Sequence, residues 1–439
     1  MRETRTFFQY VIPSIFSFAL SGVYAIVDGF FVGNSIGDVG ISAINVAYPI
    51  SAVLQALGTG LGMGGAVYYA IHKAEKHKEQ ARKFIAGSMW LLLMTSIVLT
   101  LFTFFLSTFL LRCLGAENEL LLLGKEYIDM IALGAGLQIL GTGMIPFIRN
   151  HGSSFYAMIS MVAGFIINII LDYFFVWVLQ QGVVGAAIAT VIGQGVTFLM
   201  AFLYMVHYKQ FTLKTTISDL IQVSKKIIKI GIAPFGLAMT PNISLVIINR
   251  FSILYGGQKA VAVYSCIAYI ISIVYLIFQG VGDGSQPIIS KYYGQRNHQG
   301  IKDILKLAYG FGILLALISC VLMFIARNDI GVLFGVSYEV NREVAYILPI
   351  FLVSVPFVAI TRITTAGLYA TEESLFSYIL TYIEPVFMLL FMIVLPPLFG
   401  GQIMIWWSTV FARILSAVLS VIIKKNVDKK LKIAMGSIK

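Results

Sequence analysis

The chain has 439 residues, of which 59% are hydrophobic and only 12% are charged, and its mean hydropathy is +0.89. This composition excludes a soluble globular protein and indicates a polytopic membrane protein. The net charge of +11 is compatible with nucleic-acid binding. However, the basic residues gather in connections between apolar stretches, and such a pattern favours a membrane topology over a nucleic-acid partner.

The first apolar stretch, residues 7–32, contains a single charged residue, Asp28. About 20 apolar residues span a bilayer, so this stretch is long enough. Arg2 and Arg5 precede it as in a secretory signal, but the run is too long and lacks a cleavage site of small residues. We therefore expect a retained transmembrane helix. A carboxylate inside a membrane costs from ~3 to over ~10 kcal/mol. Asp28 is thus expected to face a cavity or a partner; the alternative, a structural pair, finds no basic residue in this stretch.

Hydropathy and helix-breaking residues predict twelve transmembrane spans in all. They cover residues 7–32, 42–70, 84–112, 123–147, 155–179, 184–206, 227–254, 260–287, 303–326, 343–367, 374–398 and 403–423. The only long connection is residues 208–226. We therefore predict an N-terminal six-helix bundle over residues 1–207, a cytoplasmic linker over 208–226, a C-terminal six-helix bundle over 227–425 and a basic cytoplasmic tail over 426–439.

The basic residues also predict the orientation in the membrane. One alternating set of connections, with both termini, holds 23 of the 31 Lys and Arg residues, and the other set holds five. The positive-inside rule then places both termini in the cytoplasm of a multi-pass cell-membrane protein. The three cysteines, Cys113, Cys266 and Cys320, and the five histidines show neither a disulfide framework nor metal-ligand spacing. We expect no cofactor and no metal other than a coupling cation.

The two halves of the sequence repeat each other with a shift of 221 residues. Pro13 falls on Pro234, Asp28 on Asn249, and Ala47-Tyr48 on Ala268-Tyr269. Each half contains an even number of spans, so both enter the membrane in the same orientation. Such parallel repeats are typical of transporters. The fold we predict is an all-α membrane protein with twelve transmembrane helices in two pseudo-symmetric six-helix bundles around a central cavity. A static scaffold built by duplication is the alternative.

The first half carries a second intramembrane carboxylate, Asp172, whereas the repeat position of Asp28 holds the uncharged Asn249. Counted from the outer ends of their spans at 1.5 Å per residue, Asp28, Asp172 and Thr190 lie roughly 6, 10 and 9 Å deep. Asn168 lies one helical turn before Asp172, and Tyr24 one turn before Asp28. We therefore predict a cluster of these five residues in the outer half of the bilayer.

Two neighbouring carboxylates away from water cannot both stay ionised cheaply, so they share a proton or hold a cation. The oxygens of Asp28, Asp172, Asn168 and Thr190 suit Na⁺, with Tyr24 beside them. The sequence does not choose between H⁺ and Na⁺. The alternative is a hydrogen-bonded cluster that only packs helices.

Other polar residues lie inside the predicted spans. Glu384 and Arg413 have matched depths, which predicts an ion pair; Asp283, near the cytoplasmic end of its span, is expected to be a surface or hinge residue. The residues that we predict to line the substrate cavity are Ser21, Gln194, Asn249 and Glu384.

The chain resembles the multidrug and toxic compound extrusion (MATE) family, in particular its DinF-like branch, over essentially its whole length. The residues that carry the resemblance are Tyr24-Ala-Ile-Val-Asp28-Gly-Phe-Phe-Val-Gly33, Asn168-x-x-x-Asp172 with Gly185-Ala-Ala-Ile-Ala-Thr190, and Gln286-Pro287-x-x-Ser290-x-x-x-Gly294. The resemblance implies that Asp28 and Asp172 couple cations, with Tyr24, Asn168 and Thr190 around them. NorM-like members carry acidic residues in the second half, where this chain has Asn249.

From these features we expect a secondary active multidrug exporter that antiports lipophilic, cationic compounds outward against inward H⁺ or Na⁺. We expect a monomer whose partners are these small substrates and the lipid bilayer, with no nucleic acid. A lipid or lipid-linked oligosaccharide flippase is the main alternative, but its pyrophosphate cargo favours a basic groove. A membrane-embedded enzyme lacks a nucleophile–base pair or metal ligands at membrane depth, and a passive channel has no need of two acids in one half of a duplication.

Overall fold

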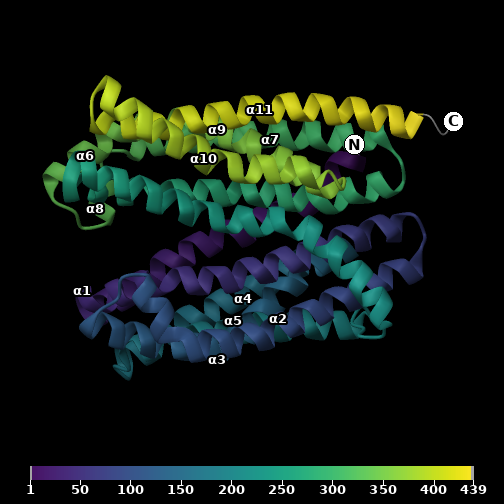
Figure 1. The fold of residues 1–439 in the computed structure, drawn as a ribbon, viewed down its shortest axis with the longest axis horizontal. Helices are drawn as coiled ribbons and strands as arrows, with labels where there is room; N and C mark the ends of the chain where they lie inside the picture. Colours follow the sequence, from purple (N-terminus) through teal and green to yellow (C-terminus); the bar gives the residue numbers. More distant parts are fainter. Residues whose placement is uncertain (1, 437–439) are drawn as a thin grey trace. The chain divides into compact units, whose positions relative to one another are not determined.

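The computed structural model describes residues 2–436, without the side chains of residues 2, 25, 32–34, 36–38, 41 and 435. Met1 and residues 437–439 of the predicted tail, and the Val32 and Gly33 side chains of the first motif, lie outside the described part. The fold is almost entirely helical (Figure 1). Its elements are α1 (Arg2–Ala74), α2 (Lys78–Cys113), α3 (Asn118–His151), α4 (Ser154–Asp172), η1 (Tyr173–Val178), α5 (Gly182–His207), α6 (Ile217–Gly294), α7 (His298–Ala326), α8 (Ile330–Leu333), α9 (Tyr338–Ala370), α10 (Ser374–Phe399) and α11 (Gln402–Gly436).

Within residues 2–436, eleven helical segments are long and apolar enough to cross a membrane. α1 contributes two of them, Glu3–Phe31 and Ser42–Ala74. α6, with 78 residues, counts as one but holds the predicted spans 227–254 and 260–287, because Gly257 has non-helical dihedral angles (φ 65°, ψ −162°). The predicted all-α membrane fold is therefore confirmed.

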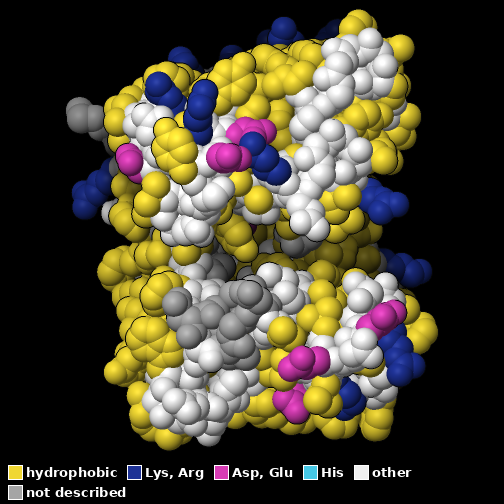
Figure 2. All heavy atoms as spheres, turned by 90° about the vertical axis from the view of Figure 1, so that its left-hand side faces the viewer, with side chains coloured by type: hydrophobic (Ala, Val, Ile, Leu, Met, Phe, Trp, Pro, Cys, Tyr) yellow, Lys and Arg dark blue, Asp and Glu magenta, His cyan; other side chains and the backbone are white. Residues whose placement is uncertain are grey.

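The exposed surface of the spans is apolar, as lipid contact requires. On α2 the large side chains of Val98, Leu101, Phe105 and Phe109 are exposed, whereas the small polar Ser96, Thr103 and Ser107 are buried. This distribution is the reverse of that in a soluble helix, and it follows because small residues let helices approach closely inside a membrane protein. Figure 2 shows hydrophobic side chains over much of one end of the molecule, with few charged side chains between them.

The helices form two compact units. One comprises residues 20–239 and is called here the first-half unit; the other comprises the described residues before 20 and from 240 onward and is called the second-half unit. The repeat shift of 221 residues relates these borders closely, because residue 19 corresponds to residue 240. The early turns of α1 and of α6 thus each pack in the unit built mainly by the other half of the sequence.

In the first-half unit, α3 packs against α2 and α5, and α5 packs against α4. Leu92, Ile128, Ile139 and Ile148 are fully or almost fully buried in its core. In the second-half unit, α9 packs against α7, α10 and α11, which run beside one another in Figure 1. The core of this unit includes Trp406, whose ring lies 5.8 Å from that of Tyr264 and 5.6 Å from that of Phe351.

The close approach of α1 and α3 depends on two glycines. A Cβ at Gly62 would lie 2.2 Å from the backbone oxygen of Gly143, which cannot move aside. We expect Gly62→Ala to destabilise the protein by about 1–3 kcal/mol, because this overlap exceeds the gain of about 1 kcal/mol in helix propensity. Gly136→Ala is the matched control: its Cβ meets only the Ser96 Cβ, at 3.7 Å, so the variant should be slightly stabilised. Thermal unfolding in detergent, followed by size exclusion, measures both; equal melting temperatures would contradict the expectation.

The segment after α5 lies against the first-half unit. The indole nitrogen of Trp90 donates to the carbonyl of Leu213 (3.0 Å), and the hydroxyl of Tyr69 donates to Oε1 of Gln210 (3.0 Å). The Lys83 ammonium pairs with the carboxylate of Asp219 at 3.1 Å. This part of the predicted linker 208–226 is therefore docked by specific polar contacts, while the division into domains stays a prediction.

Candidate cation-coupling site

Asp172 is placed by a change in helix type. It is the last residue of α4, and the chain continues as the π-helix η1, in which the amide of Leu179 donates to the carbonyl of Phe174. The hydroxyl of Ser35 donates to the carbonyl of Val176 at 2.9 Å, which ties this turn to α1. Single π-helical turns inside membrane or soluble helices are often found at functional sites. Here the turn directly follows the carboxylate predicted to couple cations.

The two predicted acids lie within electrostatic reach of each other. Asp172 is fully buried and Asp28 is partly buried. The charged group that acts on Asp172 is the carboxyl of Asp28, and Asp28 in turn interacts with Asp172. Among the ion pairs of the described residues, none includes either acid. The pair is therefore not a structural staple with a basic residue.

Polar side chains from four elements surround these acids. The side chain of Thr190 on α5 lies beside the hydroxyls of both Tyr24 and Tyr127, and both tyrosines are within the field of the two acids. Nδ2 of Asn168 donates to the Thr190 hydroxyl at 3.4 Å. The ring of Tyr24 stacks on Phe165 with centroids 5.2 Å apart, which fixes its position on α1. The structure thus brings together all five residues that the sequence predicts as a cluster.

Tyr127 on α3 is the member that the sequence did not identify. It is 6% exposed and belongs to the core of the first-half unit. The chain has 22 tyrosines, and α3 is apolar around its circumference, so no periodic pattern marks this one. Its depth in the fourth span is the single signal that was available.

Four buried oxygens of the cluster lack hydrogen-bond partners among the described residues: Oδ1 of Asp28, both carboxylate oxygens of Asp172, and Oδ1 of Asn168. A buried polar atom without a partner is costly, and an unpaired carboxylate most of all. A proton shared by the acids, or a small cation held by these oxygens, removes that cost. The donor set fits a hard cation, since it consists of oxygens alone.

The predicted cavity residues are divided between the units. Ser21 on α1 and Gln194 on α5 are partly buried in the first-half unit, and Gln194 follows Thr190 by one helical turn. Asn249, the repeat counterpart of Asp28, is partly buried in the second-half unit, and its Oδ1 has no hydrogen-bond partner among the described residues. Their role in binding substrate stays a prediction.

Glu384 forms the ion pair expected from its depth. Nε of Arg413 lies 3.2 Å from Oε1 of Glu384, and the side chains are 6% and 17% exposed, respectively. Nη1 of Arg413 also donates to the Ser354 hydroxyl (3.3 Å), and the guanidinium lies 5.0 Å from the ring centroid of Tyr275. The charges of the second-half unit are thus balanced here, unlike those of Asp28 and Asp172.

The expectation that Asp283 lies at the surface is wrong. Asp283 is 2% exposed, and it accepts hydrogen bonds from the Tyr369 hydroxyl (2.5 Å) and from Nε2 of Gln279 (2.8 Å). Tyr369 belongs to α9, 86 residues further along the chain, and it covers a position that is terminal only in its own span. Arg362 is close to this group and donates to Oε1 of Gln279 at 3.4 Å.

The chain matches known proteins along almost its whole length. It is 25% identical over 420 residues to the multidrug export protein MepA of Staphylococcus saprophyticus, which covers 94% of this chain and 92% of that protein. Its fold matches a solved MOP superfamily transporter from Pyrococcus furiosus, with a TM-score of 0.91 and 23% identity over 98% of this chain and 97% of that one. An outward-facing multidrug resistance MATE transporter matches with a TM-score of 0.90 and 23% identity, over the same shares.

The sequence profile of the MatE family matches this chain twice, over residues 13–174 and 234–394. The two matches begin at the shift that relates the halves of the sequence, which confirms the internal repeat. Together they cover more than half of the chain, and the twelve apolar spans make it a multi-pass membrane protein, a transporter rather than an enzyme. The chain therefore belongs to the MatE family, the multidrug and toxic compound extrusion family that its motifs resemble.

Proposed function

We propose that this protein is a secondary active multidrug exporter that moves lipophilic, cationic small organic compounds outward against an inward flow of H⁺ or Na⁺. The observation that carries the proposal is the pair of acids, Asp28 and Asp172, buried together without a basic partner among the described residues. The names of its relatives, multidrug export proteins of staphylococci, support the substrate class.

The acids provide a site that a small cation loads and leaves. When it is empty, the two negative charges repel each other in a medium of low dielectric constant. When a proton or Na⁺ binds, the repulsion ends and the packing around Asp28 and Tyr24 on α1 changes. α1 belongs to both compact units, so a change at Asp28 reaches the second unit along one continuous helix. One charge that crosses 100 mV supplies about 2.3 kcal/mol, near fiftyfold in concentration.

The finer features of the proposal follow from the sequence. Both termini are cytoplasmic, because the basic residues gather on one set of connections. The protein works as a monomer in the cell membrane, with bundles over residues 1–207 and 227–425, and it needs no cofactor besides the coupling ion. Asn249 at the repeat position of Asp28 supports the DinF-like branch, because the second half then lacks a titratable group there.

Transport in proteoliposomes tests the proposal. With a fluorescent cationic dye inside the transport assay, we expect accumulation on the side that corresponds to the outside of the cell when either a pH gradient or a Na⁺ gradient is imposed. The gradients are applied separately, so that the coupling ion is identified. Dye movement that follows neither gradient would contradict antiport, and movement of anionic lipid precursors in place of dye would favour the flippase.

A further inference from the structure

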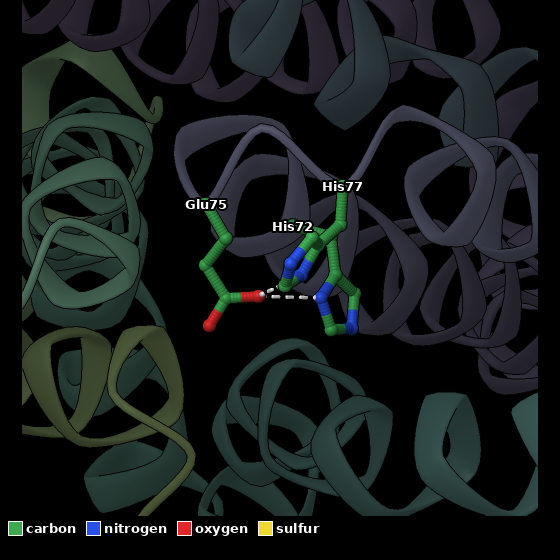
Figure 3. A group of neighbouring side chains, drawn as sticks. All are labelled: His72, Glu75 and His77. Atoms are coloured by element: carbon green, nitrogen blue, oxygen red, sulfur yellow. Dashed lines mark hydrogen bonds and ion pairs between the residues drawn. The ribbon is translucent and has the colours of Figure 1, made fainter.

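The turn between α1 and α2 gathers three metal-ligating side chains, His72, Glu75 and His77 (Figure 3). Oε2 of Glu75 lies 2.8 Å from Nδ1 of His72 and 3.3 Å from Nδ1 of His77. One ligand atom from each residue lies within 4.8 Å of the others. From the sequence we expected no metal site, because the spacing His-x-x-Glu-x-His matches no common motif, and only the turn brings the three together.

The spacing of these atoms fits a small divalent metal. Zn²⁺ binds imidazole nitrogen and carboxylate oxygen at about 2.0–2.2 Å, so ligand atoms of a tetrahedral site are roughly 3.3–3.6 Å apart. The two nitrogen–oxygen distances of the cluster are at or just below that range. Small side-chain movements are enough to admit the ion, since both imidazoles already direct Nδ1 toward the same carboxylate oxygen (Figure 3).

The second half of the chain shows that the turn itself does not require these residues. The counterpart turn, between α6 and α7, has the same backbone: Lys76 has φ 65° and Arg296, its counterpart, has φ 55°. After the one-residue gap in the repeat, Tyr292, Gln295 and Asn297 stand in place of His72, Glu75 and His77. The same fold of the chain is therefore built without a single ligand of this set.

His77 even replaces a better residue for local structure. Asn297 is the N-cap of α7, and its side chain accepts a hydrogen bond from the amide of Gly300 at 2.9 Å. His77 is the N-cap of α2 and makes no such bond. A capping Asn is worth about 1 kcal/mol relative to residues that cannot cap. The first-half turn lacks this stabilisation, which indicates that His77 serves a different purpose.

The surroundings hold the cluster in place and leave one side open. The ring of His72 stacks with Phe84 (5.3 Å) and with Tyr68 (6.3 Å), which restrains its orientation. The side chain of His77 is 65% exposed, so a fourth position is open to water. Lys73, Lys76 and Lys78 flank the cluster and oppose a cation, but the Lys73 ammonium is directed to the carbonyl of His151. The negative charge of Glu75 is therefore needed for binding.

We propose that His72, Glu75 and His77 form a binding site for Zn²⁺ or a similar first-row divalent metal, with water as the fourth ligand. The bound metal joins the last turn of α1 to the N-cap of α2. This inference stands apart from the transport function, because none of the three residues belongs to the cation-coupling site.

Titration calorimetry of the purified full-length protein, free of any histidine tag, tests the site with Zn²⁺. We expect one Zn²⁺ per chain and a rise in the melting temperature on its addition. His77→Asn copies the capping residue of the second half, so it should fold at least as well as the wild type but bind Zn²⁺ at least about tenfold more weakly. Glu75→Gln, also taken from the counterpart turn, should weaken binding similarly.

His298→Ala is the control, because this histidine lies in the counterpart turn and has no ligating group beside it in the sequence repeat. It should bind Zn²⁺ as the wild type does. Equal Zn²⁺ affinity of His77→Asn and the wild type would overturn the proposal, as would the absence of saturable one-to-one binding. In either case the cluster is hydrogen-bonded only.

Discussion

Asp172→Asn is expected to reduce ion-driven dye efflux to the level of protein-free liposomes while the protein stays folded. Both oxygens of this fully buried carboxylate lack hydrogen-bond partners among the described residues, so an amide of the same shape removes no hydrogen bond. It removes the negative charge that a cation loads, and with it the repulsion from Asp28. The variant should therefore unfold at the same temperature as the wild type or a higher one. Efflux in proteoliposomes and thermal unfolding in detergent measure the two effects.

Asp129→Asn is the matched control for this experiment. Asp129 is an acid of the same unit, on α3, and it pairs with Lys125 one helical turn away. Exposed pairs of this kind contribute about 0–1 kcal/mol, so the variant should transport and melt like the wild type. Asp28→Asn is expected to lose transport as Asp172→Asn does. Wild-type efflux in both Asp28→Asn and Asp172→Asn would show that coupling does not use this pair.

Glu384→Gln and Arg413→Gln are each expected to destabilise the protein by about 3–5 kcal/mol, because either change leaves a buried charge without its partner. The pair is 3.2 Å apart, and Arg413 has only the Ser354 hydroxyl and the Tyr275 ring as further partners among the interactions described above. The double variant Glu384→Gln/Arg413→Met should recover much of the loss, since no uncompensated charge remains. A double-mutant cycle on melting temperatures in detergent gives the coupling between the two residues.

The pair Lys259–Glu343 in the same unit is the matched control. Its charged atoms are 3.0 Å apart, but the side chains are 51% and 33% exposed, so Glu343→Gln should cost no more than about 1 kcal/mol. Transport by the double variant separates two roles. If it exports dye normally, the Glu384–Arg413 pair is structural, whereas folded protein without export would assign Glu384 to the substrate path. Additive losses in the cycle would contradict the coupling itself.

The membrane fold could be predicted from the sequence because hydropathy is a local property. Each span is recognised from its own residues, and the repeat multiplies the signal, so that Asp28 and Asn249 are identified as counterparts before any packing is known. Depth along a span is also local, since each residue adds 1.5 Å. For this reason the cluster of Asp28, Asp172, Asn168, Thr190 and Tyr24 could be predicted, whereas the direction in which each side chain points could not.

Tertiary structure alone decided which residues from distant spans cover one another. Tyr127 joins the acids because α3 turns that face toward α5, and Asp283 is buried because Tyr369 of α9 lies over it. Likewise, His72, Glu75 and His77 converge only because Lys76 takes the left-handed backbone conformation in the turn. Side-chain direction and cover depend on helix rotation and on contacts between segments far apart in the chain, and neither is encoded in the hydropathy of any single segment.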